Sequence, residues 1–198
     1  FLGTPDWERV EWGDPAHGTY GNIPKGLVEA LRFDADTIIF GTGASEKDGL
    51  KEGEYGLKMA RERMLEIPEF KTMGEEAHTW LEKRAVLELT AQNTIEEIRA
   101  GAWIAKERGA ERLIQVACRT HSARAYKFAL AVLREDPLRP FLANFYSVAS
   151  DTEYDGADMD SVVVFEPPHR PDRPKVFFNT TLQEVVGHLS DARAPELN

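Results

Sequence analysis

A histidine and an arginine stand three residues apart just after an apolar run, in the stretch Val116-Ala-Cys-Arg-Thr-His-Ser-Ala-Arg-Ala125. On a helix this spacing puts His121 and Arg124 on one face. Positive charge near the start of a helix opposes the helix dipole, so a bound anion or an acidic partner explains the pair better than stability does. Arg119 adds a third cation to this group. Because imidazole titrates near neutrality, His121 is a candidate general acid or base, with a purely structural histidine as the alternative.

A glycine pair follows an earlier apolar run, in the stretch Ile38-Ile-Phe-Gly-Thr-Gly-Ala-Ser45. Glycines at a strand end let a ligand approach the backbone, and free N–H groups there can hold an anion. The spacing matches neither a GxGxxG fingerprint nor a P-loop. Gly41, Thr42 and Gly43 are therefore candidate ligand contacts, and a tight strand-to-helix turn is the alternative.

A third polar segment reads Glu88-Leu-Thr-Ala-Gln-Asn-Thr-Ile-Glu-Glu97. The residues able to cap the helix that follows are Thr90, Asn93 and Thr94. Glu96 or Glu97 would complete a capping box. The same polar helix start can also bind an anion, which makes Asn93 and Thr94 candidate ligand contacts. Glu88 and Glu96 are candidates to orient His121 during acid–base chemistry.

The elements that would position these segments alternate between strands and helices. Short apolar runs predict strands over residues 37–40, 86–89, 113–118, 145–149 and 162–165. Helical spacing predicts a first helix beginning near Pro24, and further helices over 49–67, 74–83, 94–108, 121–133 and 182–189. This order favours a three-layer, Rossmann-like α/β domain with a mostly parallel sheet. Such sheets bind ligands beyond the carboxyl ends of their strands, which is where the three polar segments fall.

The chain divides into an irregular N-terminal arm over residues 1–21, one domain over 22–190 and a frayed tail over 191–198. The arm is rich in glycine, proline and aspartate. Trp7 and Trp12 are expected to dock onto the body of the protein, because an exposed tryptophan is costly.

Composition excludes several classes of function. The chain has 198 residues, 42% of them hydrophobic, and a formal net charge of −10. An ordinary core is expected, and nucleic acid is not an expected partner because phosphate binding needs a basic surface. The single cysteine, Cys118, rules out an internal disulfide. Its nearness to the cations leaves a thiol nucleophile as an alternative to an inert buried residue. No metal-ligand motif is present, so no metal site is predicted, and metal dependence stays open.

No apolar run is long enough to cross a bilayer, and no signal segment opens the numbered chain. No membrane contact is therefore predicted for these residues. The expected location is cytoplasmic, and an anchor preceding Phe1 stays open.

Together the three segments resemble the DUF218 family, the YdcF/SanA/ElyC-like proteins. The family carries a strand ending in glycines, a helix with an arginine, an E-x-x-(S/A)-x-N-T-x-E-N segment and a strand leading into H-x-x-R-A. The matching residues here are Gly41, Gly43, Glu88, Ala91, Asn93, Thr94, Glu96, His121, Arg124 and Ala125, with Arg61 or Arg63 as the helix arginine. Glu97 stands where the family usually has asparagine, and the resemblance covers about residues 34–135.

The resemblance implies a Rossmann-like fold and a pocket at the strand ends, and a YdcF-type member binds S-adenosylmethionine. The leading hypothesis is an enzyme or binding protein for a small anionic, nucleotide-like ligand, with S-adenosylmethionine as one candidate and Arg61, Arg119 and Arg124 among the contacts. One alternative is an envelope-related hydrolase or transferase acting on a phosphate-containing lipid precursor. Another is a non-catalytic interaction domain in which the polar segments only cap helices.

Overall fold

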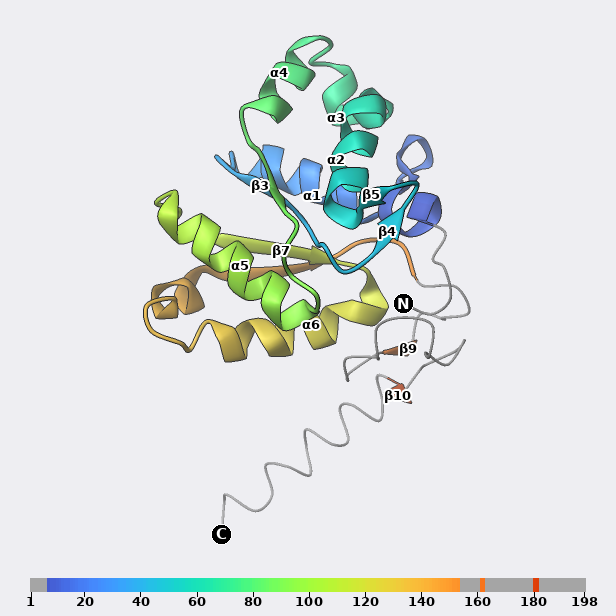
Figure 1. Ribbon diagram of the computed structural model, residues 1–198. Helices are drawn as coiled ribbons and strands as arrows, with labels where there is room; N and C mark the ends of the chain where they lie inside the picture. The colour runs from blue at the N-terminus through green and yellow to red at the C-terminus, as the bar shows by residue number, and fades with distance from the viewer. Residues whose placement is uncertain (1–6, 154–160, 163–179, 182–198) are drawn as a thin grey trace.

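The computed structural model describes residues 7–153, 161–162 and 180–181, which form a mixed α/β structure (Figure 1). The last helix predicted from the sequence, 182–189, and the predicted tail, 191–198, lie outside the described residues.

Two parallel strand pairs lie at the centre of the structure. One pair joins β3 (Ile38–Gly41) to β6 (Ala85–Glu88), and the other joins β7 (Leu113–Ala117) to β8 (Phe145–Ala149). Their β-branched and aromatic residues are those from which the sequence predicted strands, and the boundaries agree within one residue. In the described part of the chain no ladder joins β3 to β7. The mostly parallel sheet expected from the sequence is therefore seen only as two separate parallel pairs.

Three short antiparallel pairs complete the strands. They are β1 (Gly13–Asp14) with β2 (Thr19–Tyr20), β4 (Glu46–Lys47) with β5 (Leu50–Lys51), and β9 (Ser161–Val162) with β10 (Thr180–Thr181). The β4–β5 hairpin corrects the helix predicted from residue 49. Gly49 has a φ of +76°, which favours glycine and ends the hairpin turn, so the helix begins only at Glu52. The strand predicted over 162–165 is described only at its first residue.

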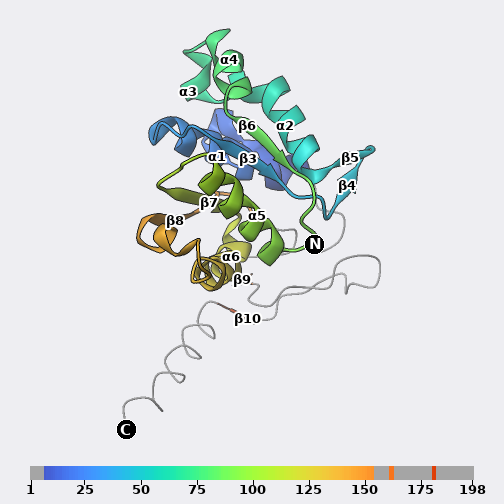
Figure 2. The same cartoon turned by 60° about the vertical axis from the view of Figure 1, so that its left-hand side comes forward.

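Helices pack against both parallel pairs (Figure 2). They are α1 (Asn22–Arg32), α2 (Glu52–Arg63), α3 (Pro68–Lys71), α4 (Glu76–Glu82), α5 (Thr94–Glu107) and α6 (Arg119–Val132). α1 and α2 contact β3 and each other, and α6 contacts β7 and β8. α5 packs along α6 and also reaches β3 and β6, so it links the two parallel pairs. The helices predicted over 94–108 and 121–133 are confirmed, with ends that differ by one or two residues.

The apolar interior consists of two separate clusters. The larger one is centred on the first four helices and includes Trp12, Leu27, Phe40, Met64, Phe70 and Leu81. The smaller one joins α5 and α6 to the segment before β8 and includes Ala102, Ala105, Val132, Leu133, Leu138 and Phe141. Each parallel pair therefore packs against its own apolar cluster.

The described part of the N-terminal arm is docked onto the body. Trp7 and Trp12 are 3% and 0% exposed, which confirms the expectation for both tryptophans. Trp12 ends the helical turn Glu8–Trp12, and Trp7 stands at its N-terminal cap. The Trp12 indole Nε1–H donates to Glu66 Oε2 at 3.0 Å, and the Arg63 guanidinium lies 4.8 Å from the Trp12 ring centroid. The arm thus contributes side chains to the core instead of lying loose at the surface.

Candidate functional site

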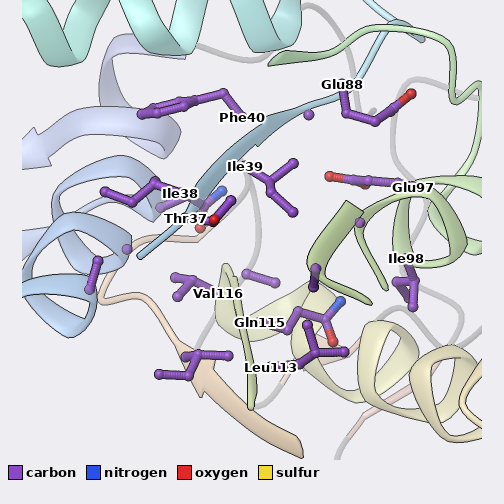
Figure 3. A pocket seen from close by; sticks show the side chains of 18 of the residues that line it. Thr37, Ile38, Ile39, Phe40, Glu88, Glu97, Ile98, Leu113, Gln115 and Val116 are labelled. Carbon is purple, nitrogen blue, oxygen red and sulfur yellow. The ribbon is translucent and has the colours of Figure 1, made fainter. Parts of the chain in front are cut away.

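A cavity of about 650 Å³ lies between the two parallel pairs. Its apolar walls come from β3 and β7, and residues of both apolar clusters line it (Figure 3). Ile38, Ile39 and Phe40 line it on one side, and Leu113 and Val116 line it on the other. Its size is that of a pocket for a small molecule.

His121, Thr94 and Arg124 line one end of this cavity. The N-terminal halves of α5 and α6 bring them together, since Thr94 Oγ1 lies 3.3 Å from His121 Nε2. Burial holds the pKa of His121 well below its ordinary 6.5, and the nearby Arg124 charge lowers this pKa further. Arg124 itself is only 4% exposed. At neutral pH the imidazole is therefore uncharged and can accept a proton, and the guanidinium supplies the positive charge.

The glycine turn after β3 contributes only part of what the sequence suggested. Gly41 and Thr42 line the cavity. The Gly43 N–H, however, donates to the Ala91 carbonyl at 3.2 Å, and Thr42 Oγ1 donates to the same oxygen at 2.7 Å. A Cβ added to Gly43 would lie 2.0 Å from the Leu89 carbonyl oxygen, so the glycine is needed for close packing of this turn on the loop after β6.

The segment after β6 is held by its own hydrogen bonds. Glu88 is buried, and its carboxylate accepts from the Thr90 and Ala91 N–H groups at 2.8 and 3.1 Å and from the Thr90 hydroxyl. Asn93 caps α5 by accepting from the Glu96 N–H at 3.0 Å. The Glu96 carboxylate in turn accepts from Asn93 Nδ2 and the Gln92 N–H, both at 2.8 Å.

The predicted capping is therefore confirmed, with Asn93 as the cap. Glu88, Asn93 and Thr94 also line the cavity, whereas Glu96 lies on its outer side among the capping bonds. The carboxylates of Glu88 and Glu96 accept hydrogen bonds from the loop after β6, and Thr94 lies within 3.3 Å of the imidazole of His121.

Two predicted arginine contacts lie away from the cavity. Arg61, on the outer surface of α2, pairs with Glu82 of α4 at 2.6 Å. Arg119, at the start of α6, pairs with Glu153 at 3.5 Å. The acidic partner that the sequence offered as an alternative to a bound anion is thus present for Arg119. The thiol of Cys118 is 1% exposed and lies 3.4 Å from Thr120 Oγ1, and Cys118 is not part of the cavity wall.

The sequence analysis missed the acidic end of the cavity. Glu11 of the arm, Glu52 at the start of α2 and Glu97 of α5 all line it. Burial raises the pKa of Glu11 from 4.5 to about 7. Burial and the charges of Glu11 and Glu97 also hold the pKa of Glu52 well above its ordinary value. Acidic residues at helix starts are usually explained by the helix dipole, so only their position around one cavity marks them as a site.

No protein-family model, curated protein or solved structure matches the chain. Among the residues that the structure describes, no helix is long and apolar enough to cross a membrane.

Proposed function

We propose that the two parallel pairs are parts of one doubly wound sheet with the strand order β6-β3-β7-β8, flanked by helices on both faces as in Rossmann-like domains. Contacts of α1 with both β3 and β7 support this order. From β3 the chain continues to β6 on one side, and from β7 it continues to β8 on the other. In such a sheet the carboxyl ends of β3 and β7 form a topological switch point, where ligands bind.

At this point the protein binds a small anionic, nucleotide-like ligand, and S-adenosylmethionine is one candidate. The observation that carries the proposal is the meeting of Thr94, His121 and Arg124 at one end of the cavity. Arg124 offers a positive charge to a phosphate or carboxylate, because the guanidinium stays ionised even when buried. The N-terminus of α6 adds to the positive potential at this site, because no acidic residue in its first turn offsets the helix dipole.

The rest of the cavity suits the remainder of such a ligand. The apolar side chains of β3 and β7 give a surface for a flat base, and Glu97 offers a carboxylate to ligand hydroxyls. His121 is the proposed acid–base residue, because it is neutral at pH 7 and hydrogen-bonded to Thr94. Membership of the DUF218 family remains part of this proposal and rests on the sequence motifs alone.

Calorimetric titration with AMP, adenosine and S-adenosylmethionine tests the proposal. AMP and adenosine differ only in the phosphate, so the native protein should bind AMP more tightly. In the Arg124→Met variant the affinity for AMP should fall by about tenfold or more, because a charged hydrogen bond is lost, while the affinity for adenosine should change little. Arg119→Met is the matched control on the same helix and should keep the preference for AMP over adenosine.

A His121→Gln variant provides a second test in case Arg124→Met does not fold, as judged by circular dichroism. It should also weaken AMP binding while leaving the adenosine affinity almost unchanged. Equal affinities of the native protein for AMP and adenosine, or absence of binding to all three ligands, would overturn the proposal.

A further inference from the structure

Three carboxylates from distant parts of the chain line the same cavity as the proposed anion site, and Glu97 lies one turn beyond Thr94 on α5. Glu11 comes from the arm, Glu52 from the first turn of α2 and Glu97 from α5. Figure 3 shows Glu97 reaching from its helix toward β3, and a Cβ added to Gly41 of β3 would lie 3.0 Å from Glu97 Oε1. Asn22, the first residue of α1, joins them, and its Nδ2 donates to Glu11 Oε1 at 3.1 Å.

Two oxygen atoms of this group are buried without a hydrogen-bond donor. They are Glu52 Oε2 and Asn22 Oδ1, which have no partner among the described residues. Both residues line the cavity. The bond from Asn22 Nδ2 to Glu11 fixes the orientation of the amide, so its oxygen remains the acceptor. The raised pKa of Glu52 favours its protonated form, and an occupant with N–H groups would replace that proton as the donor to these oxygens.

The charges of these carboxylates also favour a positively charged occupant. Glu11 and Glu97 are close enough to raise the pKa of Glu52, in addition to the effect of its burial. Crowded carboxylates of this kind are stabilised in the ionised form by a nearby positive charge. A cation in the cavity would therefore be attracted, and its binding would lower the pKa values of these carboxyl groups.

A metal ion is not the occupant that this geometry suits. In the described residues no group of three histidine, cysteine, aspartate or glutamate side chains converges closely enough to hold one. A protonated amine can instead donate three hydrogen bonds from a single centre.

We infer that the Glu11–Glu52–Glu97 end of the cavity binds a protonated amine, so that the ligand is an amphoteric molecule with an anionic group at Arg124 and an ammonium group near Glu52. The inference rests on the proposed function in placing both groups of one ligand in the same cavity. The amine subsite itself can be tested separately from the anion subsite.

Calorimetry with 1,4-diaminobutane and 1,4-butanediol gives a matched pair of probes, because only the diamine carries a positive charge. The native protein should bind the diamine and not the diol. Glu52→Gln should weaken diamine binding by about tenfold or more, since it removes a charged acceptor from the site. Glu62→Gln removes an exposed carboxylate from the same helix and should have little effect, which controls for attraction to the overall negative charge.

Proton exchange distinguishes the two subsites. Diamine binding should release protons near pH 7, because it lowers the raised pKa values of Glu11 and Glu52. AMP binding should instead raise the lowered pKa of His121. Titrations in two buffers with different ionisation enthalpies measure the proton release by the diamine, and the imidazole nitrogen resonances follow His121.

Equal diamine affinities of native protein and Glu52→Gln, or diamine binding without proton release, would overturn the amine inference. If AMP fails to bind while the diamine binds with proton release, the proposed function is wrong and the amine subsite stands. If AMP binds and the diamine does not, only the amine inference is wrong.

Discussion

Replacing Glu11 with glutamine should make the stability of the protein less sensitive to pH. The folded state raises the pKa of this carboxyl from 4.5 to about 7 through burial. Between these two pH values the folded state therefore holds more protons than the unfolded state. Stability is then fully present below about pH 4.5 and falls as the pH rises through about 7.

The magnitude follows from the same pKa change. A change from 4.5 to about 7 corresponds to about 3 kcal/mol, at about 1.4 kcal/mol for each tenfold change in proton binding. Glu11→Gln keeps the oxygen that accepts from Asn22 Nδ2 and avoids burying a charge. The variant should match the native protein near pH 5 and exceed its free energy of unfolding by up to about 3 kcal/mol near pH 8.

Urea unfolding followed by tryptophan fluorescence, at several values between about pH 5 and about pH 8, measures this difference. Glu62→Gln is the control, because this exposed glutamate lies outside the cavity and its replacement should give the same small difference at every pH. A Glu11→Gln difference that does not grow with pH would refute the account of a buried carboxylate cluster.

Three further changes test the local structure around the site. Gly43→Ala should destabilise the protein by about 1–3 kcal/mol in urea unfolding, because its Cβ would lie 2.0 Å from the Leu89 oxygen. Gly26→Ala, in an open part of α1, should not destabilise it, and a loss at both glycines would contradict this reason. Asn93→Ala should cost about 1 kcal/mol of unfolding free energy by removing the cap of α5, and Asn93→Ser should restore most of it. Arg61→Gln should change stability by less than about 1 kcal/mol and leave AMP affinity in calorimetry unchanged, since the exposed arginine pairs with α4.

Features set by neighbouring residues were largely predictable from the sequence. The strand Phe145–Ala149 was predicted with the boundaries that the structure has, because an apolar run between proline and acidic segments leaves little choice. The capping of α5 was also predictable, since the Asn93 and Glu96 side chains bond to backbone groups within the same turn. The helix start at Glu52 was missed because a glycine at positive φ extends the hairpin before it.

Features that depend on distant contacts were not predictable in this way. The acidic end of the cavity draws Glu11, Glu52 and Glu97 from segments that are far apart in the sequence. No local pattern shows that these carboxylates line one cavity. The same limit applies to Arg119 and Arg124, which lie five residues apart on one helix. Only the packing shows that Arg119 pairs with Glu153 and that Arg124 lines the cavity.

The central claim is that an anionic ligand binds beside His121, and nuclear magnetic resonance of the imidazole nitrogens tests it most directly. In the protein without ligand, His121 should stay neutral to well below pH 6.5, because burial and Arg124 oppose its protonation. Saturation with AMP should raise the pKa of His121, since a bound phosphate stabilises the imidazolium ion. Adenosine should leave that pKa almost unchanged. A His121 titration that is the same with and without AMP would contradict the account.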